Sequence, residues 1–471
     1  MFVDMNRNGS WDSVRPGSLR SSRQKLELPV SSLRPRFGIV YALESRPPVL
    51  ETFFIAFQHT LAMFVGIITP PLIIAAGLGL PPDETSFFVS MALFASGLST
   101  VTQVMRVGPV GTGLLSVQGT SFTFVGPALA AGAVGGIPLM LGMSILAAPV
   151  EIILSFVLGF ARRLFEPVVT GTSVMMIGFS LIHVGMTNFA GGVGAKDFGS
   201  ARNLGLGLLV IVVIIFFNRF GRGVGRIGAV TFGLGAGYVV AGIAGVVDFR
   251  PVREADWLLF PTPFHYGLSF DLRFLAPFAF SYLITTLESV GDITATSQVS
   301  GEPVSGPIYM QRVRGGVLAD GLNSILAAVF NSLPNTTFAQ NNGVIQLTGV
   351  ASRVVGYATA VILMALGLMP KLGALVAVMP PAVLGGATVV LFGLVAMAGV
   401  RIVAQGGFSG RTMLILAVAC GLGLGVQTVP GALAQLPEAW HPILGSPLIV
   451  GTMTAMILNL VFPPESEEDE E

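Results

Sequence analysis

Long apolar stretches of about 20 residues, the length of a helix that crosses a bilayer, recur along the whole sequence. Apolar residues make up 52% of the 471 residues and charged residues only 11%, whereas a soluble domain carries about 25% charged residues. We therefore expect an all-α polytopic membrane protein. The twelve predicted spans are 52–77, 86–105, 137–160, 166–186, 204–218, 227–247, 272–291, 315–333, 354–377, 380–399, 411–432 and 445–462.

Two further apolar stretches are short and are interrupted by helix-breaking residues. One, SVQGTSFTFVGPALAAG, begins at Ser116, and the other, SLPNTTFAQNNGVIQL, begins at Ser332. The matching residues are Ser116, Thr120, Ser121 and Phe122 in the first stretch and Ser332, Thr336, Thr337 and Phe338 in the second. We therefore predict fourteen spans in two repeats of seven, with the third and tenth spans short and partly extended. An odd number of spans inverts the second repeat, which brings the broken spans together at mid-membrane.

The positions of basic residues support this count, because cytoplasmic loops carry an excess of Lys and Arg. With the N-terminus inside, the loops predicted to be cytoplasmic carry Arg106, Arg162, Arg163, Arg219, Arg222, Arg226, Arg312, Arg314, Arg353, Arg401 and Arg411. The predicted regions are a basic cytoplasmic tail (1–48), two inverted repeats (49–250 and 251–463) and an acidic cytoplasmic tail (464–471). No cleavable signal peptide is expected, so we predict a multi-pass protein of the inner (cytoplasmic) membrane.

Three adjacent amides, Gln340, Asn341 and Asn342, lie in the second interrupted stretch. Amides are costly to bury unpaired, and irregular backbone inside a membrane must be enclosed by protein or line a cavity. We therefore predict that residues 119–127 and 335–343 face each other across a binding site. The alternative is that the amides only cap a helix and hold neighbouring spans together.

Glu288 and Asp292 are four residues apart and share one face of a predicted helix, about 6 Å apart along its axis. Desolvation and the nearby like charge both favour a protonated carboxyl group, so we expect this pair to bind a proton. The alternative is a helix-end pair in a watery vestibule or a pair that bonds to Arg312 or Arg314. Asp320, a further intramembrane carboxyl group, is either functional or extends to Arg314.

His59 follows Gln58 near the start of the first span, where a histidine is more often a packing residue that orders a site than a proton carrier. Cys420 is the only cysteine, which rules out an intrachain disulfide and argues against a thiolate metal cluster. The sequence predicts no metal site, no cofactor and no nucleic-acid partner. It also lacks the nucleophile and base, or metal cage, that an intramembrane enzyme would need.

The segment QNNGVIQLTGVASR resembles the signature of the nucleobase-ascorbate transporter family, also called the nucleobase-cation symporter-2 family. That signature has an acidic residue or Gln, then Asn, any residue, Gly and a later Thr, as Gln340, Asn341, Gly343 and Thr348 do here. Other motifs of the family's bacterial xanthine and uric acid permeases are similar to Gln58-His59, to the spacing from Glu288 to Asp292 and to GVLADG around Asp320. The resemblance covers about residues 47–463.

The resemblance implies that Glu288 and Gln340 bind a purine, that Asn341 shapes the site, and that the backbone around Ser121 and Phe122 stacks on or bonds to the ring. From their positions in the predicted spans, we assign proton coupling or ordering of the site to Asp292, His59 and Asp320. Uracil-type members have Glu where this chain has Gln340, and an amide suits the mixed donors and acceptors of an oxopurine. Close xanthine-type sequences have Asn where this chain has Ser121, so uric acid is also an expected substrate.

The resemblance further implies the fold of the anion and sulfate carriers. Spans one to four and eight to eleven would form a core domain, and spans five to seven and twelve to fourteen a gate domain and a homodimer interface. The expected function is proton-coupled symport of xanthine, uric acid or both by alternating access. Sodium coupling, another nucleobase (uracil, guanine or hypoxanthine) and an anion exchanger or channel of the same fold remain open alternatives.

Overall fold

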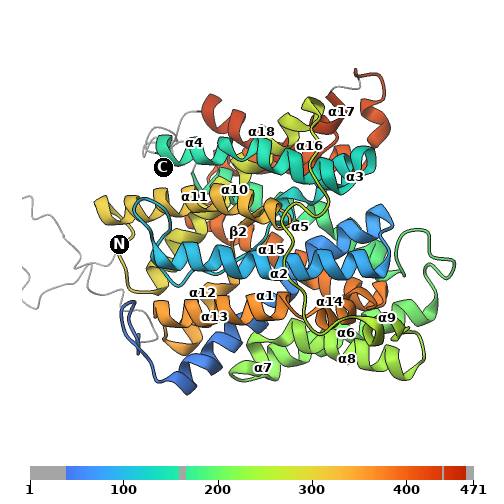
Figure 1. The fold of residues 1–471 in the computed structure, drawn as a ribbon. Coiled ribbons are helices and arrows are strands. Elements are labelled where there is room, and N and C mark those ends of the chain that lie inside the picture. Colours follow the sequence, from blue (N-terminus) through green and yellow to red (C-terminus); the bar gives the residue numbers. More distant parts are fainter. Residues whose placement is uncertain (1–38, 159–165, 438–439, 463–471) are drawn as a thin grey trace, which may run out of the picture. The chain divides into compact units, whose positions relative to one another are not determined.

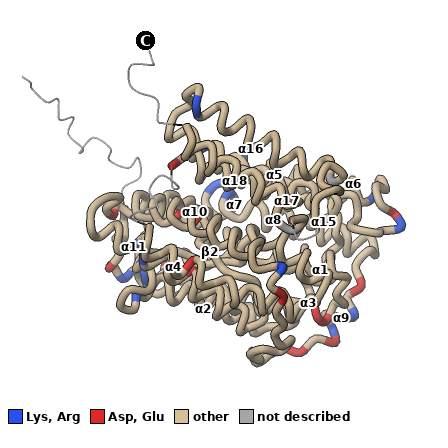
Figure 2. Tube along the Cα trace, turned by 90° about the horizontal axis from the view of Figure 1, so that it is seen from above, with Lys and Arg blue, Asp and Glu red and all other residues tan. Residues whose placement is uncertain are grey.

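The computed structural model describes residues 39–158, 166–437 and 440–462. Within them the chain is almost entirely helical, with two three-residue strands among the helices (Figure 1). Charged residues gather mainly at helix ends and in loops, and most of the chain trace between them is uncharged (Figure 2). Residues 1–38 of the predicted basic tail, Arg162, Arg163 and the predicted acidic tail lie outside the described residues.

Each of the twelve predicted stretches overlaps a helix or a pair of helices. The long helices are α1 (Val49–Leu78), α2 (Pro82–Met105), α3 (Val125–Ala147), α5 (Pro167–Phe189), α6 (Ala201–Phe220), α8 (Ala229–Ile243), α10 (Leu275–Val299), α11 (Gly306–Val329), α13 (Arg353–Gly367), α15 (Pro381–Gln405), α16 (Gly410–Thr428) and α18 (Pro447–Val461). The shorter ones are α4 (Pro149–Val157), α7 (Val224–Ile227), α9 (Arg250–Glu254), α12 (Gln340–Thr348), α14 (Pro370–Ala377) and α17 (His441–Leu444), with 3-10 turns at 122–124, 272–274 and 430–433.

By length and apolar composition, eight helices in the described residues can cross a membrane, or nine if the bent pair α13 and α14 is one span. The protein is therefore a mostly helical, multi-pass membrane protein. The predicted span 354–377 is not one straight helix, because α13 and α14 meet at an angle of 73°. The cause is Pro370, which cannot donate a backbone hydrogen bond and disfavours helical geometry at the residue before it.

The two interrupted stretches lie together, as the sequence predicts, but they pair directly instead of facing each other across a gap. Strands β1 (Gln118–Thr120) and β2 (Asn335–Thr337) are antiparallel, with Gly119 opposite Thr336. The ladder continues beyond the strands, since the Phe338 N–H donates to the carbonyl of Val117 (3.1 Å) and the Ser121 N–H to that of Pro334 (2.9 Å). This pairing satisfies backbone groups that the broken helices leave without partners.

Two groups of helices pack mainly within themselves. The first, here called the strand group, contains both strands and the helices α1 to α4 and α10 to α14. The second, here called the α5/α15 group, contains α5, α6, α8, α15, α16 and α18. Helix α10 lies between the two groups, because it packs against α11, α3 and α4 on one side and against α5 and α18 on the other.

Glycines allow α5 and α15 to approach very closely. A Cβ atom at Gly399 of α15 would lie 2.4 Å from the backbone nitrogen of Met175 and 2.5 Å from the carbonyl oxygen of Gly171, both on α5. A Cβ atom at Gly178 would lie 2.4 Å from the nitrogen of Ala396. Small residues are the usual means by which helices make close backbone contacts in a membrane.

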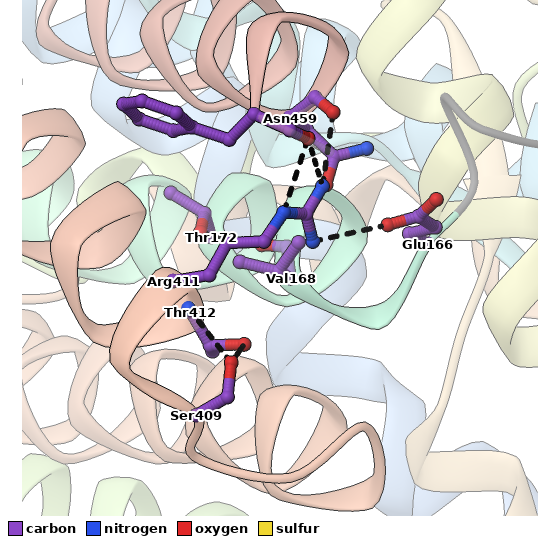
Figure 3. Close-up of polar contacts among 8 residues, drawn as sticks. Glu166, Val168, Thr172, Ser409, Arg411, Thr412 and Asn459 are labelled. Carbon is purple, nitrogen blue, oxygen red and sulfur yellow. Dashed lines mark hydrogen bonds and ion pairs between the residues drawn. The ribbon is translucent and has the colours of Figure 1, made fainter. Parts of the chain in front are cut away.

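Arg411 joins three elements at one end of the α5/α15 group (Figure 3). It lies in the first turn of α16, and its guanidinium group donates to the carbonyl of Asn459 (2.9 Å) and to that of Phe462 (3.2 Å from Nε) at the end of α18. Its Nη1 lies 3.6 Å from Oε2 of Glu166, the residue before α5. The side chain therefore fastens α16 to α18 and to the start of α5.

We predict that Gly399→Ala destabilises the protein by about 1–3 kcal/mol, because the added methyl group meets backbone that cannot move without separating α5 from α15. Gly393→Ala on the same helix is the matched control, since a Cβ atom there meets no atom within 4 Å. Thermal unfolding of the two variants in detergent is the measurement. Equal melting temperatures for both variants would contradict the predicted packing.

Candidate functional site

The paired strands enclose an aromatic ring at the centre of the strand group. A Cβ atom at Gly119 of β1 would lie 2.4 Å from Cζ of Phe338, and one at Gly66 of α1 would lie 2.7 Å from its Cε2. Phe338 is only 7% exposed. The two glycines therefore accept the ring against the backbone of β1 and α1, which fixes the position of the strands relative to the first helix.

Asp320 is the centre of a buried hydrogen-bond network behind the strands. Its side chain has no exposed surface. Gln103 of α2 donates to Asp320 Oδ1 (2.6 Å), and Ser289 of α10 donates to Asp320 Oδ2. The Ser289 hydroxyl also lies 3.2 Å from that of Thr336 in β2. Asp320 thus links α2, α10, α11 and β2, and it does not extend to Arg314 as one sequence interpretation allowed.

The arginines proposed as alternative partners of the carboxyl groups have other contacts. Arg314 donates to the backbone carbonyls of Ser155 (3.3 Å) and Phe156 (3.1 Å) at the end of α4. Arg312 is paired with Glu302 at 2.8 Å. Neither arginine forms an ion pair with a predicted site carboxyl group among the described residues.

Two of the three adjacent amides join α12 to its neighbours. Asn341 is 1% exposed and donates to the carbonyl of Leu115, in the segment before β1 (2.5 Å). Asn342 accepts a hydrogen bond from the Thr296 hydroxyl of α10 (2.7 Å). His59 of α1 is fully buried beside Asn341, and neither of its ring nitrogens has a hydrogen-bond partner among the described residues.

Ser121 is likewise fully buried, and its hydroxyl accepts a hydrogen bond from the backbone N–H of Thr123 (3.3 Å). It caps the turn that connects β1 to α3. This local bond explains why a serine suits the end of β1, because serine side chains commonly accept such bonds at helix starts. The Ser121 hydroxyl is therefore already engaged in a hydrogen bond with the backbone.

Four predicted residues are half-buried instead, namely Phe122, Glu288, Asp292 and Gln340. Phe122 meets Phe392 of α15 edge to face, with ring centroids 5.4 Å apart and an interplanar angle of 89°. It therefore lies at the boundary between the strand group and the α5/α15 group.

Glu288 faces the same boundary. Ile284, one turn earlier, packs with Phe392 and other residues of the α5/α15 group. Gly291, one turn later, lies beside Thr170 of α5, where a Cβ atom would be 3.7 Å from its Cγ2. Residues three and four apart share a helix face, and the Glu288 Oε2 atom has no hydrogen-bond partner among the described residues.

Gln340 begins α12, and Gly343 lies one turn further along the same face. A Cβ atom at Gly343 would meet no atom within 4 Å, so this face of α12 borders open space. Phe122, Glu288 and Gln340 thus lie at the less buried edge of the strand pair, while Ser121, Asn341, His59 and Asp320 form its buried support. A planar polar ligand has an aromatic face, a carboxyl group and an amide available at this edge.

Sequence reasoning missed several residues of the buried network. Gln103 and Ser289 hold Asp320, and Glu151 of α4 is a fourth intramembrane carboxyl group with no exposed surface. Glu151 lies inside the predicted span 137–160, where a lone carboxyl group in an apolar run is itself a functional signal. Gln103 lies in an apolar span too, but a single glutamine gives no comparable signal.

A separate hollow of about 500 Å³ lies away from these residues. It is lined by residues 42–45, Glu302, Arg312 and Arg353. The segment before α1 reaches it, since Tyr41 forms a parallel bridge with Val350 and Glu44 pairs with Arg353 at 2.9 Å. None of the predicted binding residues lines this hollow. Within the described residues, no group of three or more His, Cys, Asp and Glu side chains is placed to hold a metal ion.

The overall arrangement of the chain is similar to that of solved membrane proteins. The transmembrane domain of the cyanobacterial bicarbonate transporter BicA superposes with a TM-score of 0.57, covering 89% of this chain and 99% of that domain. The sequence identity is 14%. This likeness shows the fold.

Sequence comparison gives the family. A family model described as "Permease family" matches residues 50–432. The xanthine permease XanP of Escherichia coli is 46% identical over 442 residues, which cover 91% of this chain and 96% of XanP. The uric acid permease PucK of Bacillus subtilis is 37% identical over 415 residues, or 88% of this chain and 96% of PucK. The chain belongs to this permease family, the nucleobase-ascorbate transporter family that its motifs resemble, and is a transport protein and not an enzyme.

We predict that Gly119→Ala impairs the site, because the new methyl group must displace the buried Phe338 ring, at a cost of about 1–3 kcal/mol. The double variant Gly119→Ala, Phe338→Leu should recover stability, since the smaller side chain leaves room for the methyl group. Thermal unfolding of both variants measures this coupling. The control is Gly126→Ala, where a Cβ atom meets nothing within 4 Å; a double variant less stable than the single Gly119→Ala variant would contradict the predicted contact.

Proposed function

We propose that this protein imports an oxopurine, xanthine and/or uric acid, across the cytoplasmic membrane in symport with protons. The observation that carries the proposal is the placement of half-buried Phe122, Glu288 and Gln340 beside the paired strands, with Phe122 and Glu288 facing the α5/α15 group. The names of the relatives XanP and PucK support both purines as substrates.

The chemistry of these three side chains fits a flat ring with alternating N–H and C=O groups. A carboxylate accepts from ring N–H groups, and the Gln340 amide both donates and accepts. An aromatic side chain such as Phe122 provides a stacking or edge contact. Ser121, whose hydroxyl already accepts from Thr123, leaves more room than a longer side chain would. This supports a site that admits the additional oxo group of uric acid.

Proton coupling is proposed from the distribution of hydrogen bonds among the carboxyl groups. Asp320 accepts from two side-chain donors, which is the environment that a negative charge needs. Glu288 has a buried oxygen without such a donor among the described residues, as a group that carries a proton in this state would. We propose that protonation at the Glu288 and Asp292 cluster favours purine binding and that His59 and Asp320 order the site.

The driving force follows from charge movement. If one net positive charge enters per cycle, a membrane potential of 100 mV contributes about 2.3 kcal/mol, or roughly fiftyfold accumulation. The pH gradient adds to this value. Sodium coupling is the alternative that the same oxygen-bearing groups would allow.

Alternating access is proposed from the two packing groups. The strand group contains all of predicted spans one to four and eight to eleven, and the α5/α15 group contains spans five to seven and twelve to fourteen. This division supports a core that moves against a gate and fourteen spans in two inverted repeats. The basic residues of the predicted cytoplasmic loops support both termini in the cytoplasm. The gate would also supply a homodimer interface. The antiparallel pair β1 and β2, one strand from each half, supports the inverted repeat.

We predict that cells lacking their own purine permeases accumulate labelled xanthine or uric acid when they express this protein, and that a protonophore abolishes the accumulation. Glu288→Gln should lose accumulation by at least about tenfold, because the amide can neither accept on both oxygens nor carry the proton. Uptake of both purines, with and without protonophore, is the measurement.

The matched control is Glu254→Gln, an exposed carboxyl group in the short helix α9, which should transport like the wild-type protein. Absence of uptake of either purine, with the protein present in the membrane, would overturn the proposed substrate. Accumulation that resists the protonophore and requires sodium would overturn the proposed coupling and leave the substrate in place.

We also predict that Gln340→Glu weakens oxopurine uptake by at least about tenfold, since a carboxylate cannot donate to a ring carbonyl and its charge must be desolvated. Gln346→Glu, on an exposed part of the same helix α12, is the control for the added charge. Competition of unlabelled xanthine, uric acid and uracil against labelled xanthine separates affinity from turnover. Equal inhibition profiles for wild-type and Gln340→Glu proteins would remove Gln340 from the site.

A further inference from the structure

Glu151 is a buried carboxyl group that the proposed function does not use. It lies in α4 and has no exposed surface. Its Oε1 lies 3.0 Å from the Thr285 hydroxyl of α10, and its Oε2 has no hydrogen-bond partner among the described residues. None of the ion pairs in the described part of the chain includes Glu151. An unpaired carboxylate buried in this way would be very costly.

The hydrogen bonds of Thr285 bear on the form of Glu151. The Thr285 oxygen lies 3.0 Å from Glu151 Oε1 and 3.1 Å from the carbonyl oxygen of Tyr282. A hydroxyl group has one hydrogen and cannot donate fully to both oxygens. If Thr285 donates to Tyr282, the contact with Glu151 is a complete hydrogen bond only when the protonated carboxyl group donates to Thr285. The contact allows a neutral Glu151 that donates to Thr285 or an ionised one that accepts from it, and complete burial without an ion pair favours the neutral form.

Glu151 lies between the two helices that carry the other carboxyl groups. Thr285 precedes Glu288 by one helical turn on α10. On the other side, Ile152 of α4 packs against Gly321, the residue after Asp320, where a Cβ atom would lie 3.2 Å from the Ile152 nitrogen. Glu151 is also within electrostatic range of both Glu288 and Asp320. Its charge would repel theirs.

The other ionisable groups on the elements packed against α4 are few. Helix α3 has none in its sequence. Those on α10 and α11 are Tyr282, Glu288, Asp292, Tyr309, Arg312, Arg314 and Asp320. Of the two arginines, one is paired with Glu302 and the other is bonded to carbonyl groups at the end of α4. Neither is available to neutralise Glu151.

We propose that Glu151 is a positioning residue for transport, which in its protonated form holds the turn of α10 before Glu288 against α4 through Thr285. Loss of its proton adds a negative charge beside Glu288 and Asp320, and the carboxylate then competes with the Tyr282 carbonyl for the single hydroxyl hydrogen of Thr285. Transport therefore requires Glu151 to be protonated. This inference rests on the proposed purine symport.

The test uses labelled xanthine uptake by the full-length protein, with KM and Vmax measured across pH. Glu151→Gln keeps a donor for Thr285 but cannot ionise, so its Vmax near neutral pH should stay within about twofold of wild type with the same KM. As the pH rises into the alkaline range, the Vmax of Glu151→Gln should fall less steeply than that of the wild-type protein, by up to tenfold per pH unit. The reason is that the amide at position 151 has no proton to lose.

Glu151→Leu removes the bond and should lower Vmax by at least about tenfold. The paired variants Thr285→Ser, which keeps the hydroxyl, and Thr285→Val, which removes it, should behave like wild type and like Glu151→Leu respectively. The two Thr285 variants test whether the bond between Glu151 and Thr285 is needed for transport if Glu151→Leu does not reach the membrane. The control on α4 is Ser155→Ala, one turn further on, whose hydroxyl bonds only to the carbonyl of Ile152 in its own helix.

Two results would overturn the proposal while wild-type uptake is intact. Glu151→Gln as defective as Glu151→Leu would show that an ionised carboxylate is required. Wild-type kinetics in both Glu151→Leu and Thr285→Val would show that the bond has no role in transport. Absence of purine uptake by the wild-type protein would instead contradict the proposed function, and this inference would fall with it.

Discussion

The pairing of β1 with β2 is the interaction on which the rest of the site depends. A chain that leaves helical geometry inside a membrane exposes N–H and C=O groups, and each one without a partner costs several kcal/mol. Here the two broken segments satisfy each other, one from each half of the chain. Glycines at 66 and 119 admit the Phe338 ring beside the pair. The chain leaves the antiparallel pair at opposite ends, into a 3-10 turn and α3 after β1 and into the short helix α12 after β2.

Polar residues around the strands fall into two kinds with different physical tasks. The fully buried ones, such as Asp320 and Asn341, form hydrogen bonds to neighbouring segments and so fix where the strands lie. The half-buried ones include Glu288, which lies with Phe122 toward the α5/α15 group, and Gln340 at the start of α12. A buried network that is well satisfied is rigid. We infer that it holds the binding groups in place while the boundary between the two helix groups changes.

Much of this architecture could be predicted from the sequence, because apolar length and helix-breaking residues follow directly from the bilayer. The twelve apolar stretches and the meeting of the two broken segments were accessible in this way. The direct strand pairing was not, because it depends on how distant segments meet. The bend at Pro370 was missed although a proline is a local signal for it. The motif identified Glu288 and Gln340 as candidates, but it could not show that Asn341 bonds to the Leu115 carbonyl. Glu151 was missed although a carboxyl group in an apolar run is a strong signal.

The most direct test of the central claim is proton movement by the purified protein. Proteoliposomes that contain the protein and an internal pH-sensitive dye would receive xanthine or uric acid outside, in sodium-free buffer with the membrane potential clamped by potassium and valinomycin. The account predicts acidification of the lumen that begins with purine addition and is absent from protein-free vesicles. Entry of labelled purine without any change of internal pH would contradict proton symport.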